Sequence, residues 1–123
     1  MIKPDEYMSS PVVTVEPHTT LDEMASLMDE KNIGCLVVTE HEKVVGIATE
    51  RDILRKVLAH HKDPNEVQAK DIMTKEVFTV QKDATLMEVA ALMKQHTFRR
   101  IIVMHEEKPV GIITSRDLIG LLV

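Results

Sequence analysis

The chain has 123 residues and a net charge of −5, and 44% of its residues are hydrophobic but only 2% are aromatic. This length allows one compact core, or two small halves that share one. The acidic balance provides no clustered basic surface for a nucleic-acid duplex, so we do not expect nucleic acid as a partner. The sequence has no apolar run long enough to span a membrane and no leader at Met1, which predicts a cytoplasmic protein that does not bind a membrane.

The sequence contains an internal repeat. Residues 8–58 align with 73–123 without a gap, and 19 of the 51 aligned positions are identical. The most complete match joins Gly46–Asp52 to Gly111–Asp117, 65 residues later. Since unrelated segments do not share this much, we predict two copies of one unit. The predicted domains are a first repeat over 1–61, a linker over 62–69 with Asp-Pro-Asn turn chemistry, and a second repeat over 70–123.

Each copy is predicted to have the element order β-α-β-β-α. In the first copy, apolar and β-branched residues over 12–15 predict a strand that ends before Pro17. Thr20 and Glu23 have the spacing of a capping box and begin a helix. Two apolar runs, over 35–39 and 44–48, predict a hairpin, and a last helix follows position 49. The apolar stripe of the first helix consists of Leu21, Met24, Ala25 and Met28, and the second copy repeats these elements at 78–80, from 86, at 100–104, at 109–113 and after 114.

The repeated phrase Gly-Ile-x-Thr-x-Arg-Asp joins the end of a strand to the start of a helix, and it has two interpretations. In the first, the threonine is the helix N-cap and the aspartate three residues later completes a capping box. In the second, the amides of the helix N-terminus, the threonine hydroxyl and the arginine, which is Arg116 in the second copy, bind a phosphate. The aspartate then accepts hydrogen bonds from vicinal hydroxyls such as those of ribose. The residues alone favour neither interpretation.

The element order, the tandem pairing and the phrase Gly-hydrophobic-x-Thr-x-x-Asp, present twice in register, resemble a pair of CBS domains, named after cystathionine β-synthase. The resemblance covers essentially the whole chain. It implies an α/β (α+β) fold in which two β-α-β-β-α repeats pack about a pseudo-two-fold axis. It also implies a regulatory module that binds AMP, ADP or ATP, and sometimes S-adenosylmethionine, in clefts between the copies. Such a module needs no cofactor and forms a homodimer.

The resemblance further implies which residues line the two clefts. The aspartates of the repeated phrase would contact ribose hydroxyls, and its threonines would lie near ribose or phosphate. Each cleft would combine the phrase of one copy with the first strand and the second-strand entry of the other. The first cleft is expected to join Thr49 and Asp52 to Thr79, Val80, Arg99 and Arg100, and the second to join Thr114 and Asp117 to Thr14, Val15, Gly34 and Cys35.

The two clefts are not expected to be equivalent. Arg99 and Arg100 stand where the first copy has Gly34 and Cys35. Because two guanidinium groups can fork onto phosphate oxygens, we expect the first cleft to bind charged nucleotides more tightly. The alternative is that both arginines belong to a solvated strand end.

No other chemistry is expected. The six histidines lie in predicted turns, the linker or helix ends, and none repeats at the 65-residue offset, so a surface role is favoured over metal binding. Cys35 is interpreted as a buried thiol. No nucleotide-hydrolase loop, nucleophile elbow or metalloprotease segment is present, which predicts a protein that is not an enzyme. Two function classes remain: a nucleotide sensor that signals to a separate, unidentified protein, and a dimerisation module with empty clefts.

Overall fold

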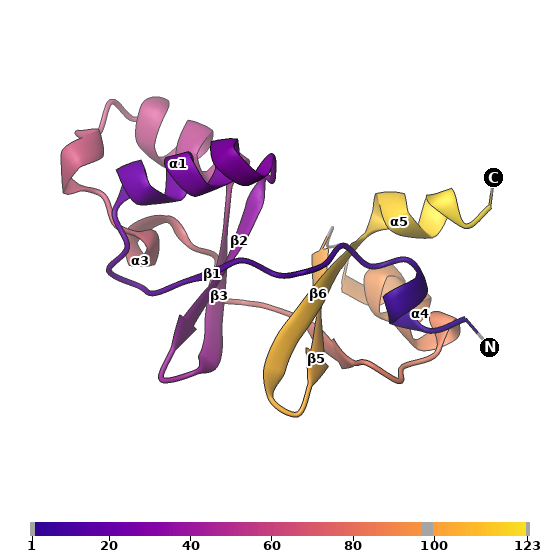
Figure 1. Cartoon of the computed structure of the whole chain (residues 1–123). Coiled ribbons are helices and arrows are strands. Elements are labelled where there is room, and N and C mark those ends of the chain that lie inside the picture. Colours follow the sequence, from indigo (N-terminus) through magenta and orange to yellow (C-terminus); the bar gives the residue numbers. More distant parts are fainter. Residues whose placement is uncertain (1, 97–99, 123) are drawn as a thin grey trace. The chain divides into compact units, whose positions relative to one another are not determined.

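The computed structural model describes residues 2–96 and 100–122 (Figure 1). The chain divides into two compact units. One, here called the central unit, is Val13–Glu76. The other, here called the terminal unit, combines Met1–Val12 with Val77–Val123. Each unit holds one copy of the predicted strand and helix pattern, so the mixed α and β fold with two repeated units is confirmed.

The central unit has a three-stranded sheet in the order β1-β2-β3. Strands β1 and β2 are parallel, and β2 and β3 form the predicted antiparallel hairpin. Helix α1 begins after Thr20, whose Oγ1 accepts a hydrogen bond from the Glu23 amide at 3.2 Å. The elements in chain order are β1 (Thr14–Val15), α1 (Leu21–Lys31), β2 (Cys35–Glu40), β3 (Lys43–Thr49), α2 (Glu50–Asp52), the π-helix η2 (Ile53–Leu58), the 3₁₀ turn η3 (Pro64–Glu66) and α3 (Ala69–Ile72).

The terminal unit repeats this arrangement with a sheet in the order β4-β5-β6. Strand β4 is parallel to β5, and β5 and β6 form the second hairpin. The last helix is regular α-helix, whereas its counterpart in the central unit continues as a π-helix. The elements are the 3₁₀ turn η1 (Pro4–Glu6), β4 (Thr79–Gln81), α4 (Leu86–His96), β5 (Arg100–His105), β6 (Lys108–Thr114) and α5 (Ser115–Gly120).

Each unit has its own apolar core. In the central unit, Met24 and Met28 of α1 pack with Leu36 and Val38 of β2 and Val57 of η2. Alternate residues of a strand point to the same face, so this set shows that both helices cover one face of the sheet. The predicted stripe is correct except at its third member, Ala25, which is exposed. The core of the terminal unit consists of Tyr7, Ala84, Val89, Ile101, Val103 and Ile113.

The compact units do not coincide with the sequence repeats. Ser9 forms an antiparallel bridge to Ile112, so the first twelve residues belong with the second copy. Thr74 forms the matching bridge to Ile47, so residues 70–76, predicted as the start of the second repeat, belong with the first copy. The predicted linker, 62–69, contains η3 and the first residue of α3. The two copies therefore exchange the segments that precede their first strands, residues 1–12 and 70–76, here called the exchanged segments.

Among the described residues, none of the helices combines the length and the apolar character that crossing a membrane requires.

Candidate functional site

The repeated phrase forms a strand-to-helix corner in each unit. In the central unit, Thr49 ends β3 and its Oγ1 accepts a hydrogen bond from the Asp52 amide at 3.2 Å. In return, Oδ2 of Asp52 accepts from the amide of Thr49 at 2.9 Å and from its hydroxyl at 3.1 Å. Thr114 and Asp117 make the same three hydrogen bonds, at 3.3, 2.8 and 3.1 Å. The capping interpretation of the phrase is confirmed at both corners.

The cap reduces what the helix N-terminus of the central unit can offer to an anion. The Glu50 amide donates to the carbonyl of Gly34 at 3.0 Å. The Asp52 amide is held by Thr49, as described above. Two of the first three amides of this helix are therefore already hydrogen-bonded inside the protein. A phosphate bound at this corner would therefore depend on side-chain donors more than on the helix amides that the sequence analysis expected.

Asp52 is buried, with only 12% of its side chain exposed, and both carboxylate oxygens have partners. Oδ2 accepts the two hydrogen bonds from Thr49. Oδ1 lies 3.2 Å from Nζ of Lys56, which is four residues further along the chain, in η2. The same Nζ donates to the carbonyl of Ile72, at the end of α3, at 2.8 Å. Lys56 thus links the repeated phrase to the segment that pairs with β3.

Asp117 has a different environment. The aligned position of Lys56 in the second copy is Leu121, whose side chain packs against the core of the terminal unit. Asp117 is half-buried, and within residues 2–96 and 100–122 its Oδ1 has no hydrogen-bond or ion-pair partner. The two corners have the same cap but present different carboxylates to a ligand.

The glycine of each phrase makes room for a methionine. A Cβ atom at Gly46 would lie 2.8 Å from Sδ of Met73 and 2.9 Å from the carbonyl oxygen of Thr74. A Cβ atom at Gly111 would collide with the side chain of Met8. Met8 and Met73 occupy the same position in the two copies. The glycines are therefore explained by packing of the exchanged segments, without a ligand.

The other predicted residues of the central unit lie near its corner. Cys35 pairs with Thr49 in the β2–β3 register, and Gly34 precedes it. Thr14 and Val15 form β1, which pairs with β2 further along, at residues 37 and 38. Val15 is buried and Thr14 is exposed, while Cys35 is half-buried and not buried as expected.

The terminal unit has the matching arrangement. Arg100, half-buried, begins β5 and pairs in register with Thr114. Thr79 and Val80 on β4 pair with residues 102 and 103 of β5. Arg116 is exposed. Arg99 lies outside the described residues. Both predicted clefts join residues of one unit to residues of the other, so the clefts and their ranking stay predictions.

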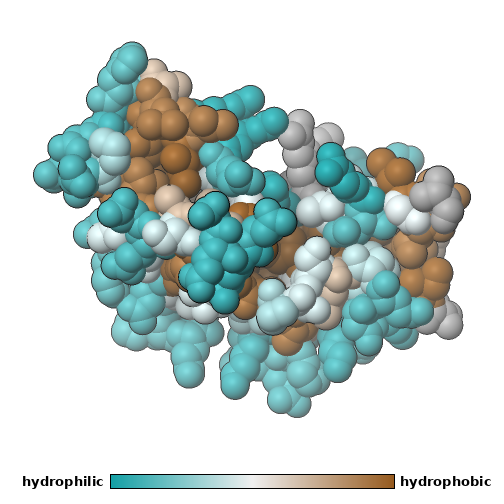
Figure 2. All heavy atoms as spheres, turned by 45° about the horizontal axis from the view of Figure 1, so that its top comes forward, coloured by the Kyte–Doolittle hydropathy of each residue, from teal (hydrophilic) through white to brown (hydrophobic). Residues whose placement is uncertain are grey.

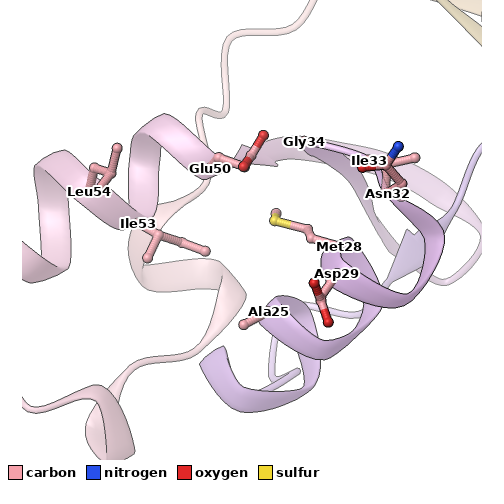
Figure 3. A pocket seen from close by; sticks show the side chains of 9 residues that line it. All are labelled: Ala25, Met28, Asp29, Asn32, Ile33, Gly34, Glu50, Ile53 and Leu54. Carbon is pink, nitrogen blue, oxygen red and sulfur yellow. The ribbon is translucent and has the colours of Figure 1, made fainter.

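A cavity of about 440 Å³ opens beside the corner of the central unit (Figure 3). Figure 3 shows Met28 and Asp29 of α1 on one side and Ile53 and Leu54 of η2 on the other. Glu50, directly after the N-cap threonine, lies at its edge next to Gly34. The cavity therefore combines an apolar floor with carboxylates, a lining that suits an apolar side chain better than a phosphate. Its full lining is Ala25, Met28, Asp29, Asn32, Ile33, Gly34, Glu50, Ile53 and Leu54.

The sequence analysis did not identify Lys56 or the two methionines as parts of the corner. The spacing of Asp52 and Lys56, four residues apart on a helix, is a recognisable signal for an ion pair. For the contacts between the glycines and the methionines, the only signal in the sequence is that Met8 and Met73 occupy the same position in the two copies.

The histidines whose side chains are described lie at the surface. His18, His41, His60, His61 and His105 are all exposed. Within the described part of the chain, no group of three or more histidine, cysteine, aspartate and glutamate side chains is arranged to hold a metal ion.

Comparison with known proteins agrees with the fold. The sequence model of the CBS-domain family matches residues 5–59 and 69–123. Uncharacterized protein MK0525 of Methanopyrus kandleri is 39% identical over 110 residues, which are 88% of this chain but 56% of that protein, so the chain spans little more than half of this relative.

Two solved structures are similar over nearly the whole chain. An uncharacterized conserved protein from Pyrococcus horikoshii has a TM-score of 0.82 and 32% identity, and the match covers 98% of this chain and 91% of that one. Hypoxic Response Protein I, solved with two coordinated zinc ions, has a TM-score of 0.78 and 32% identity over 98% of this chain and 99% of its own. With both repeats matched and the element order observed in each unit, the chain belongs to the CBS-domain family and consists of a tandem pair of CBS domains.

Proposed function

We propose that the chain is a regulatory module, not an enzyme, that binds an adenosine nucleotide such as AMP, ADP or ATP and passes its ligand state to a partner protein. The observation that carries the proposal is the pair of threonine-capped carboxylates. Oδ2 of Asp52 and of Asp117 accepts the same two hydrogen bonds in each unit. A fixed carboxylate at a strand-to-helix corner is a suitable acceptor for the hydroxyls of a ribose.

Arg100 supports the phosphate part of the proposal. It begins β5 directly opposite Thr114 and is half-buried. A guanidinium group held in this way can form charge-assisted hydrogen bonds to phosphate oxygens. The net negative charge of the chain does not oppose this, because a small anion requires only a local group of donors.

Thermal unfolding in the presence of AMP, ADP, ATP and S-adenosylmethionine tests the proposal. A ligand present at about 100 times its Kd should stabilise the folded chain by about 2.7 kcal/mol. Asp52→Asn and Asp117→Asn keep an oxygen for the cap but lose the charge, so the double variant should lose the part of this stabilisation that comes from the ribose hydroxyls. The proposal fails if none of the four compounds raises the melting temperature of the natural sequence.

A second candidate is a dimerisation module, favoured by exposed apolar side chains on the last helix of each unit. Leu54 and Leu58 of η2 are 59% and 53% exposed, and Ile119, at the position of Leu54 in the second copy, is 62% exposed. In Figure 2, brown apolar side chains interrupt the teal surface of the molecule. A homodimer would remove such side chains from water. Sedimentation of the natural sequence and of Leu54→Ser distinguishes this candidate: a dimer that becomes a monomer in the variant supports it.

The two candidates give different results in the melting experiment. The melting temperature of a pure dimerisation module rises with protein concentration and does not rise when nucleotide is added. A nucleotide sensor responds to ligand at a fixed protein concentration.

A further inference from the structure

The two corners differ in how many hydrogen bonds their aspartates can still accept. An ionised carboxylate has about four acceptor positions, two on each oxygen. At Asp52, Oδ2 uses two for Thr49 and Oδ1 uses one for Lys56. At Asp117, Oδ2 uses two for Thr114, and Oδ1 has no partner within the described residues. A vicinal diol needs two acceptor positions, which Asp117 has in full and Asp52 has only in part.

Lys56 is held at Asp52 by more than one contact. Its Nζ also donates to the Ile72 carbonyl at 2.8 Å, and its side chain is 42% exposed. Ile72 ends α3 and is itself buried, with 2% exposure. A diol that engages both hydroxyls at Asp52 must therefore displace an ammonium group that has a second, internal partner.

The helices that bear these residues differ as well. After Asp52 the chain continues as the π-helix η2, which carries Lys56. After Asp117 it continues as the α-helix α5, and Leu121, aligned with Lys56, is its C-cap residue. A single turn of π-helix inside or after an α-helix is unusual and is found often at functional sites. The difference between the corners is thus present in the backbone as well as in the side chains.

We propose that Lys56 is a specificity-determining residue: it makes the Asp52 corner insensitive to the ribose diol, so that Asp117 alone distinguishes ribonucleotides from 2′-deoxyribonucleotides. The inference rests on the proposed function and assigns a ligand class to each corner. The Asp117 corner takes nucleotides with an intact 2′,3′-diol. The Asp52 corner, where the lysine already occupies the carboxylate, accepts nucleotides with ribose and with 2′-deoxyribose alike.

This assignment modifies the expected ranking of the clefts. The ranking was based on phosphate contacts alone, whereas Lys56 acts on the diol. Diol selectivity is therefore assigned to the Asp117 corner, independently of the phosphate affinity of either corner.

Calorimetric titration with AMP and 2′-deoxyAMP tests the inference on five proteins: the natural sequence, Asp52→Asn, Asp117→Asn, Asp117→Asn with Lys56→Met, and Asp117→Asn with Arg55→Met. Arg55 is a matched control, because it is the exposed neighbour of Lys56, carries the same charge and, in the described part of the chain, forms no ion pair with Asp52. Thermal unfolding of each variant verifies that it is folded. The measured quantity is the ratio of the Kd for 2′-deoxyAMP to the Kd for AMP.

In the natural sequence and in Asp52→Asn we expect one site with a ratio well above one, and in Asp117→Asn we expect only a ratio near one. Adding Lys56→Met to Asp117→Asn should restore a ratio of roughly ten, which corresponds to one additional hydrogen bond to a charged group. Adding Arg55→Met should leave the ratio near one. A change in stability alone would alter both affinities and not their ratio.

The inference is overturned if Lys56→Met and Arg55→Met give the same ratio, or if Asp117→Asn retains the ratio of the natural sequence. In both cases nucleotides still bind and the proposed function stands. If neither compound binds to any of the five proteins at millimolar concentration, the proposed function fails and the inference fails with it.

Discussion

Gly46 and Met73 are in direct contact although they belong to different sequence repeats: a Cβ atom on the glycine would lie 2.8 Å from the methionine sulfur. Gly111 and Met8 form the equivalent contact in the terminal unit. Since each methionine begins the aligned part of one copy and each glycine belongs to the phrase of the other, the packing requires both residues in both copies. The glycine of the repeated phrase is thus required by the packing of the exchanged segments.

Gly46→Ala is expected to destabilise the protein. The new methyl group meets the backbone oxygen of Thr74 at 2.9 Å as well as Met73, so side-chain movement alone cannot relieve the contact. Overpacking of this kind costs about 1–3 kcal/mol in the free energy of unfolding, which urea denaturation measures. Gly120→Ala is the control: a Cβ atom there meets nothing within 4 Å, and the helix should gain up to about 1 kcal/mol. Equal effects of the two substitutions would contradict the packing argument.

Thr49→Ala should destabilise the central unit without any ligand present. The substitution removes the acceptor for the Asp52 amide and the hydroxyl donor to Oδ2 of Asp52. Loss of an N-cap costs about 0.5–2 kcal/mol. Thr49→Ser retains both hydrogen bonds and should stay within a few tenths of a kcal/mol of the natural sequence. If alanine and serine variants melt at the same temperature, the capping box contributes nothing and the phrase has to be explained by binding alone.

Tyr7→Phe is expected to stabilise the terminal unit. The ring of Tyr7 belongs to the core, and its hydroxyl is buried with no hydrogen-bond partner in the described part of the chain. A buried unsatisfied hydroxyl costs about 1–3 kcal/mol, so its removal should raise the free energy of unfolding by about 1 kcal/mol. Urea denaturation at neutral pH measures the difference. A loss of stability would show that the hydroxyl has a partner.

The same tyrosine predicts a pH dependence. Burial raises the pKa of the Tyr7 hydroxyl above its ordinary value of 10.0. In the unfolded chain this hydroxyl ionises near pH 10, whereas in the folded chain it keeps its proton to a higher pH. The resulting contribution to stability is complete below pH 10 and is lost as the pH rises toward the folded pKa. The natural sequence should therefore lose stability above pH 10 more steeply than Tyr7→Phe, as measured by urea denaturation at each pH.

Fragments of the chain should fold only when they follow the compact units. A fragment of residues 1–61 lacks Thr74, which pairs with Ile47, and the buried Ala69 and Ile72 of the core. A fragment of residues 13–76 keeps all three. Circular dichroism should show a cooperative thermal transition for 13–76 and none for 1–61. A cooperative transition in 1–61 would mean that the exchanged segment is dispensable.

The elements with periodic apolar patterns were predicted correctly. The strands around β2 and β3, the helix α1 and its cap at Thr20 all have a local signature in spacing or end residues. The exchanged segments have no such signature, since their β-pairing is limited to one bridge each, Ser9 to Ile112 and Thr74 to Ile47. A contact between distant residues that leaves no periodicity cannot be deduced from one sequence.

The candidate site was predicted in part. The hydrogen bonds of Thr49 with Asp52 follow from their spacing alone. The role of Lys56 does not, because its spacing from Asp52 is equally typical of a solvated surface pair. Its contact with the Ile72 carbonyl, which distinguishes it from such a pair, depends on α3 and hence on the exchanged segment.

The exchange of segments between the copies has a consequence for how such a chain can change over time. Loss of one whole sequence repeat would not leave a small intact domain, because the remaining copy would keep a glycine shaped for a methionine that had been deleted. Duplication or deletion of residues 13–76 would instead add or remove one complete unit. The boundaries at which this protein can be cut or joined are therefore set by packing, and they are out of phase with the repeat that its sequence displays.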